Sequence, residues 1–97
     1  MSRKTDREEE GATAPNDAEL IASYIELDPR NRSRAEARLV GSGVPVWAIV
    51  GQYQATGRDA AYVAESYQVP LAAVQAALAY YRQNMAVIED RLEANAV

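Results

Sequence analysis

Residues 57–74 read GRDAAYVAESYQVPLAAV, and this stretch decides the fold. A short amphipathic segment follows Asp59, whose side chain suits the N-cap of a helix. Ala64 is a small residue where two helix axes can approach closely, and Val69 lies in the following turn, where it can fill the core. Pro70 then favours the first position of a second helix. The stretch therefore has the layout of a helix-turn-helix.

One more helix is predicted before this motif. Residues 46–56 place apolar side chains at helical spacing, Pro45 stands at a favoured first position, and Gly57 suits the end. A helix is also predicted for residues 60–67, and another begins after Pro70. Three helices around one core make the expected fold class mainly α.

The last helix carries the clearest periodicity in the chain. Residues 71–97 contain no Gly or Pro, so we expect one extended helix of about 25 residues. Its apolar residues alternate steps of four and three, which is a heptad stripe: Val74, Leu78, Tyr81, Met85, Ile88 and Leu92. The distal half extends beyond two short helices, so it predicts a partner or dimer interface, with packing inside one chain as the alternative. The predicted interface residues are Tyr80, Tyr81, Met85, Ile88 and Leu92.

The amino-terminal part predicts a disordered tail followed by a short β-hairpin. Residues 1–16 are polar and acidic and have almost nothing to bury. Asn16 and Glu19 have the spacing of a capping box, which predicts a short helical turn. Residues 24–27 and 37–40 are β-prone and flank an arginine-rich loop. Because a lone hairpin is barely stable, it must pack on the helices or on a second protomer.

The bulk composition limits the possible functions. A chain of 97 residues with 48% hydrophobic residues forms one small domain, expected over residues 17–97. It contains no Cys and no His, which excludes disulfides, thiolate metal sites and the commonest general base. We find no nucleophile–base pair, so neither an enzyme nor a cofactor is expected. No apolar run is long enough for a membrane span and no secretion signal is present, so a cytoplasmic protein is expected.

Charge and side-chain chemistry give mixed signals about DNA. The net charge of −4 opposes strong non-specific binding. The start of the helix after Pro70 offers mostly leucine and alanine, including Ala73 and Ala76, which we expect to be exposed. Arginines can contact phosphates, and one glutamine can read a base, although a solvated surface is the alternative for the arginines. The candidate DNA contacts are Arg30, Arg32, Arg34, Arg58, Gln75 and Arg82.

Three segments share a pattern with a known family. They are YIELDP at residues 24–29, GSGVPVW at residues 41–47 and AVQAALAYY at residues 73–81. With these segments, residues 20–92 resemble the bacterial family catalogued as domain of unknown function 433. Gly43 stands where that family typically has an arginine, so any phosphate contact or salt bridge of that arginine is missing here.

The resemblance has implications for fold and function. The family is similar to VapB-type antitoxins, which implies a homeodomain-like helical core with an amino-terminal β-hairpin. It implies that the chain binds and neutralises a PIN-like ribonuclease toxin and represses its own operon. The implied partners are that nuclease and operator DNA, and we also expect a homodimer. The carboxylates of Glu89, Asp90 and Glu93 could then face a basic groove of the nuclease. The alternative is a DNA-binding regulator without a toxin partner.

Overall fold

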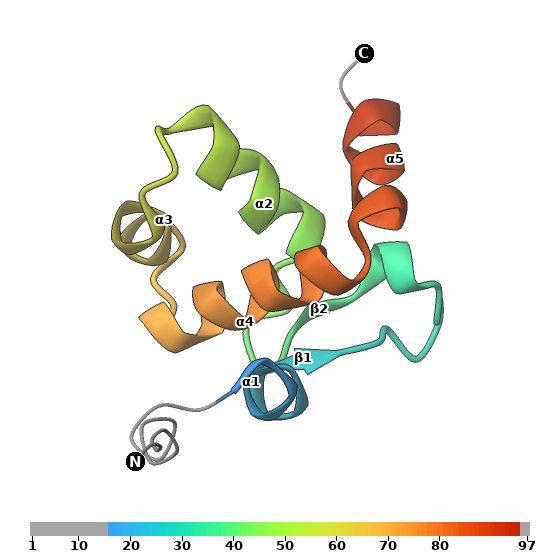
Figure 1. The fold of residues 1–97 in the computed structure, drawn as a ribbon. Coiled ribbons are helices and arrows are strands. Elements are labelled where there is room, and N and C mark those ends of the chain that lie inside the picture. The colour runs from blue at the N-terminus through green and yellow to red at the C-terminus, as the bar shows by residue number, and fades with distance from the viewer. Residues whose placement is uncertain (1–15, 96–97) are drawn as a thin grey trace, which may run out of the picture.

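The structure, a computed structural model, describes residues 16–95 (Figure 1). In this part of the chain, helices predominate and two short strands form a hairpin. The elements are α1 (Asp17–Tyr24), β1 (Ile25–Glu26), the 3₁₀ turn η2 (Arg34–Glu36), β2 (Arg38–Leu39), α2 (Val46–Ala55), α3 (Ala60–Tyr67), α4 (Leu71–Gln83) and α5 (Met85–Asn95). The predicted tail lies outside the described residues except for Asn16. Among residues 16–95, no helix combines the length and apolar character that crossing a bilayer requires.

Helices α2, α3 and α4 surround one apolar core, as the mainly helical prediction requires. The Asp59 side chain accepts a hydrogen bond from the Tyr62 backbone N–H at 3.1 Å and so caps α3. Gln68 ends α3 in the left-handed region with φ 57°, and Pro70 is the N-cap of α4. Side chains from all three helices meet in the interior and are fully buried: Val46, Ile49, Val50, Val63 and Val74.

The predicted hairpin is present, with shorter strands than expected. β1 and β2 are antiparallel, with Ile25 opposite Leu39 and Glu26 opposite Arg38. On its other side, β2 meets the segment before α2, where the Leu39 N–H donates to the Val44 carbonyl at 2.8 Å. The Leu39 side chain is 1% exposed. The hairpin is therefore anchored on the helical core of the same chain.

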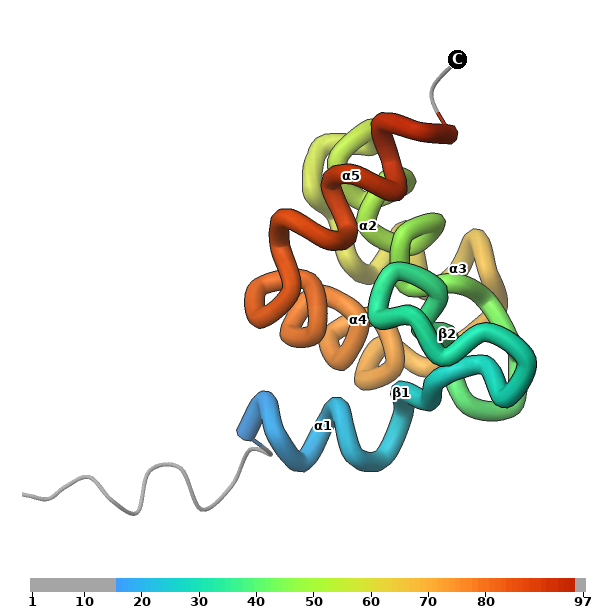
Figure 2. The backbone as a smooth tube through the Cα atoms, turned by 90° about the vertical axis from the view of Figure 1, so that its right-hand side faces the viewer, coloured from blue at the N-terminus to red at the C-terminus, as the bar shows by residue number. Residues whose placement is uncertain are grey.

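Helix α1 is longer than the single turn that the sequence predicts. Asn16 and Glu19 form the capping box expected from their spacing, with hydrogen bonds of 2.8 and 3.2 Å. The helix continues for eight residues to Tyr24 and packs along α4 (Figure 2). Its buried residue is Leu20.

The prediction of one extended carboxy-terminal helix is wrong. The helix breaks at Asn84, which has φ −138° and ψ 41°, and α5 turns back to pack on α2 and η2 (Figures 1 and 2). The Asn84 side-chain amide donates to the Tyr80 carbonyl at 3.0 Å, and its oxygen accepts from Arg34 Nη1 at 2.9 Å. These bonds compete with the regular helical pattern, which explains a break without Gly or Pro.

The bend also changes the environment of the heptad stripe. Ile88 is fully buried, and Leu92 packs on α2, where its Cδ2 lies 3.1 Å from the position of a Cβ added at Gly51. Met85 is 46% exposed. The expectation that the chain could not cover the distal half of this stripe is therefore wrong for Ile88 and Leu92.

Candidate functional site

The predicted DNA contacts come from several separate elements of the fold. Arg30, Arg32 and Arg34 lie between β1 and β2, whereas Arg58 and Arg82 line a hollow of about 170 Å³ beside α4. The remaining candidate, Gln75, is exposed on α4 and does not line that hollow. The hollow is completed by Tyr53, Leu78 and Tyr81.

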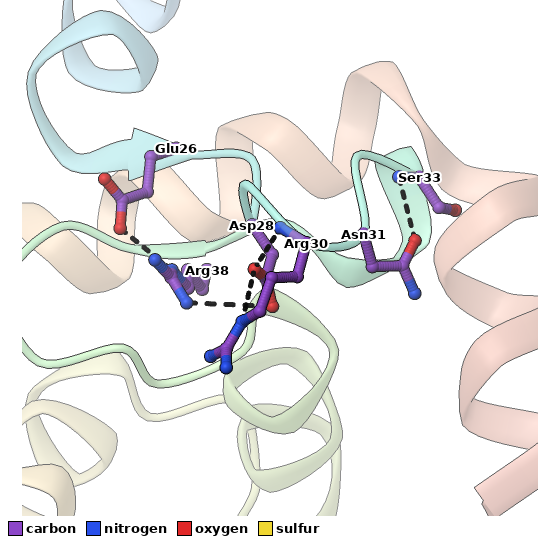
Figure 3. Close-up of polar contacts among 6 residues, drawn as sticks. All are labelled: Glu26, Asp28, Arg30, Asn31, Ser33 and Arg38. Atoms are coloured by element: carbon purple, nitrogen blue, oxygen red, sulfur yellow. Dashed lines mark hydrogen bonds and ion pairs between the residues drawn. The ribbon is translucent and has the colours of Figure 1, made fainter.

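The arginine-rich loop is held by carboxylates of the hairpin. Arg38 Nε lies 2.8 Å from Glu26 Oε2, and Arg38 Nη1 lies 3.7 Å from Asp28 Oδ2 (Figure 3). The Asp28 carboxylate also accepts from the Arg30 backbone N–H at 2.9 Å, while the Arg30 side chain is 89% exposed. The side-chain oxygen of Asn31 accepts a hydrogen bond from the Ser33 backbone N–H at 3.2 Å. The positive charge of this loop is thus partly offset by acidic neighbours, which weakens its attraction for phosphate.

Arg34 has a structural position that the sequence did not predict. Besides its bond to Asn84, its backbone carbonyl accepts from the Tyr80 hydroxyl at 2.9 Å. The pKa of Tyr80 is raised above its ordinary value because the side chain is buried, and the charge of Arg34 opposes part of this rise. Arg34 therefore joins η2 to the end of α4.

Helix α1 packs on α4. Ala76 and Ala79 lie on the side opposite Val74, yet both are fully buried. At one end of this contact, Arg82 Nη2 donates to both carboxylate oxygens of Asp17 at 3.1 and 3.0 Å. The expectation that Ala73 and Ala76 would be exposed is wrong, because Ala73 is 3% exposed. The exposed residues left on α4 are Leu71, Gln75, Arg82 and Gln83.

An apolar groove of about 340 Å³ lies where α1, β1, η2 and the end of α4 meet. The sequence did not predict it, because its walls come from segments up to 63 positions apart, Ile21 and Asn84 being the outermost. Its lining residues are Ile21, Ile25, Glu26, Leu27, Arg34, Tyr80 and Asn84.

The outward face of α5 is acidic. Glu89, Asp90 and Glu93 are all exposed. The basic residue of this helix, Arg91, turns inward, where its Nε lies 2.7 Å from Glu36 Oε2 and its guanidinium lies 4.4 Å from the ring centroid of Trp47. Within residues 16–95, no three His, Cys, Asp or Glu side chains are grouped so as to hold a metal ion. The face therefore presents negative charge without a cation beside it on the helix.

The five predicted interface residues differ in exposure. Tyr80 is 8% exposed and Ile88 is fully buried, whereas Met85 is open to solvent. Tyr81 and Leu92 are half-buried and pack against the core. A contact with another chain at these positions stays a prediction, and in this structure Met85 is its most accessible member.

Comparison with known proteins gives one finding. The family model described as "Protein of unknown function (DUF433)" matches residues 25–81. This range contains the hairpin, α2 and α3 and most of α4, and it leaves out α1 and α5. No curated protein and no solved structure matches the chain.

Proposed function

The chain belongs to the DUF433 family, and we propose that it is a non-enzymatic, antitoxin-type protein that binds and neutralises a PIN-like ribonuclease. In this proposal, α2, α3 and α4 form a homeodomain-like helix-turn-helix scaffold. The scaffold positions α5, whose exposed face contacts the nuclease.

The observation that carries the proposal is the acidic face of α5. Asp90 and Glu93 are three positions apart and Glu89 and Glu93 are four apart, so their carboxylates share one side of the helix. A nuclease that holds RNA needs a positively charged groove, and a helix with this charge pattern complements such a groove. Met85, one turn before Glu89, adds exposed apolar surface beside the carboxylates.

The packing of α1 on α4 favours a protein as the binding partner of this chain rather than DNA. Reading base edges requires a helix face that is free to enter the major groove. Here two alanines on that face are buried, and Arg82 is paired with Asp17.

A ribonuclease inhibition assay tests the proposal. The chain is titrated against the PIN-like ribonuclease encoded beside its gene, with a fluorogenic RNA as substrate. We expect inhibition near equimolar ratio, and we expect Asp90→Lys/Glu93→Lys to weaken it about tenfold or more. This variant keeps Glu89, which accepts the hydrogen bond from the Tyr81 hydroxyl.

The single variant Glu93→Lys should also weaken inhibition, and Glu65→Lys is its matched control, because Glu65 is an exposed helical carboxylate on α3. It makes the same charge change away from α5 and should leave inhibition unchanged. No inhibition by the wild-type chain, or equal inhibition by all these variants, would rule the proposal out.

DNA binding is the second candidate function. It is favoured by the left-handed Gln68 between α3 and α4, which gives the tight turn of a helix-turn-helix, and by the exposed Arg58 and Gln75. In this version the chain regulates its own operon without a nuclease partner.

A further inference from the structure

The boundary between α4 and α5 is a break in a stretch that otherwise favours one helix. No Gly or Pro occurs from Leu71 to Asn95, and the break is confined to Asn84. In a straight helix, Met85 would continue the apolar stripe of Tyr81 and Ile88, whereas the bend leaves Met85 46% exposed. Local sequence therefore favours a straight helix, and tertiary contacts favour the bend.

Two side-chain contacts hold the bent form. Arg34 Nη1 donates to Asn84 Oδ1 at 2.9 Å. The Tyr81 hydroxyl donates to Glu89 Oε2 at 2.6 Å. Residues eight positions apart in a straight helix are separated by about 12 Å along its axis, so this second bond depends on the bend.

Helix α5 obtains its buried surface from α2 and η2. Ile88 is fully buried and Leu92 lies against Gly51. Arg91 reaches Glu36 of η2 and stacks on Trp47 of α2. A second copy of the chain carries an identical docking surface and an identical helix.

We propose that Asn84 is a hinge and that α5 exchanges between two copies of this chain. When α4 and α5 straighten, each α5 leaves its own α2 and docks on α2 and η2 of the other copy. The contacts of α5 with α2 and η2 form in the monomer and in the exchanged dimer, whereas the two contacts of the bent form occur in the monomer alone. The hinge conformation and the protein concentration therefore set the balance. This inference is independent of the nuclease proposed above.

A charge-exchange experiment tests the dimer directly. Glu36→Arg and Arg91→Glu each place like charges at the contact between η2 and α5 in the monomer. In an exchanged heterodimer of the two variants, one contact pairs the introduced arginine with the introduced glutamate, and the other pairs the native Glu36 with the native Arg91. Both contacts then have opposite charges.

After the two variants are unfolded together and refolded, we expect about tenfold more dimer than from either variant alone. Native mass spectrometry should show one copy of each variant in that dimer.

The double variant Glu36→Arg/Arg91→Glu is the folding control, because it restores the opposite charges within one chain. It should have the helix content of the wild type by circular dichroism. If the refolded mixture contains monomers alone while this control is folded, the proposal is overturned.

Substitution of the hinge residue provides a second test. Alanine favours a helix more than asparagine does, and each dimer contains two hinges, so Asn84→Ala should lower the dimer dissociation constant about tenfold. Asn84→Gly removes the same side chain but disfavours a straight helix, and it should not promote the dimer. Light scattering on a sizing column over a concentration series measures both. Equal dissociation constants for the two variants would also overturn the proposal.

Discussion

Tyr81 lies at the joint between α4 and α5, and its pKa reports on that joint. Its pKa is raised, chiefly by the hydrogen bond to Glu89 and further by burial and by the negative charge of that carboxylate; Gln54 and Arg58 act in the opposite direction. A raised pKa in the folded state means that folding favours the protonated phenol. The resulting stabilisation is present below the ordinary tyrosine pKa of about 10 and is lost as the pH rises through the raised value.

Replacing the acceptor should therefore lower the pKa of Tyr81. In Glu89→Gln, the neutral amide accepts the hydrogen bond less strongly and no negative charge opposes the phenolate. The chain has six tyrosines, so the titration of Tyr81 is obtained from the phenolate absorbance by subtracting the curve of Tyr81→Phe. An unchanged Tyr81 curve in Glu89→Gln would show that the bond to Glu89 does not persist in solution.

Alanine substitutions of Ile88 and Met85, compared with each other, test whether α5 packs on α2 in solution. Ile88 is fully buried and Met85 is 46% exposed. Ile88→Ala should lower the free energy of unfolding by about 2–5 kcal/mol because it leaves a cavity between α5 and α2. Met85→Ala should lower it by less than about 1 kcal/mol. Urea unfolding measures both, and similar losses would contradict the docked position of α5.

Gln68 carries backbone strain in the turn before α4. Its φ of 57° lies in the left-handed region, which glycine adopts at little cost. Gln68→Gly should raise the free energy of unfolding by about 0.5–1 kcal/mol. Glu65→Gly, inside α3, should lower it by about 1 kcal/mol instead. If both substitutions destabilise the chain in thermal unfolding, Gln68 does not have this conformation in solution.

At the scale of elements, the stability of α1 depends on its first turn. The capping box of Asn16 and Glu19 satisfies two backbone N–H groups that no helical carbonyl can reach. Asn16→Ala should loosen α1 by about 1 kcal/mol, which corresponds to about fivefold faster amide exchange there if α1 opens independently. Asp59→Ala removes the cap of α3 and serves as the comparison. Equal exchange rates of α1 in both variants would contradict this prediction.

Local signals were sufficient to predict several elements. Asp59 and Pro45 mark the starts of α3 and α2, and the β-prone residues 24–27 and 37–40 contain the two strands. Each of these signals acts within a few residues of the element that it specifies, so the sequence alone reveals it.

The break at Asn84 could not be predicted in the same way. Arg34, which holds it, is 50 positions away in the sequence, and residues near the break otherwise favour a continuous helix. The same reason applies to the cover of α4 by α1 and to the inward turn of Arg91 toward Glu36. Tertiary contacts decide these features, and they determine which candidate site residues are accessible.

At the scale of the whole molecule, several arginines are paired with carboxylates, whereas two carboxylates of α5 are not paired with a cation within the described residues. Arg38, Arg82 and Arg91 each lie within 3.0 Å of a carboxylate oxygen. The carboxylates of Asp90 and Glu93 have no such cationic partner within residues 16–95, and the net charge is −4. A surface of this kind attracts cationic partners and repels polyanions.

This charge distribution opposes DNA binding, which a gel shift with the promoter of the chain's own operon tests. We expect the wild-type chain to bind this duplex no more tightly than an unrelated one, with a dissociation constant weaker than about 10 µM at about 150 mM salt. Substituting Arg30, Arg32 and Arg34 with alanine should change little, because Asp28 lies beside Arg30 and Arg34 is bonded to Asn84.

Asp17→Ala sharpens the same experiment, because it frees Arg82 from its carboxylate and weakens the cover on α4. If DNA binding is only blocked by α1, this variant should gain affinity for the promoter over the unrelated duplex. If the wild-type chain already binds the promoter specifically, with a steep salt dependence that the triple arginine variant loses, DNA is the target and the acidic face of α5 needs another explanation. If the nuclease is the sole target of the chain, we expect neither result, since a helix face covered by α1 and a surface of net negative charge both oppose entry into the major groove.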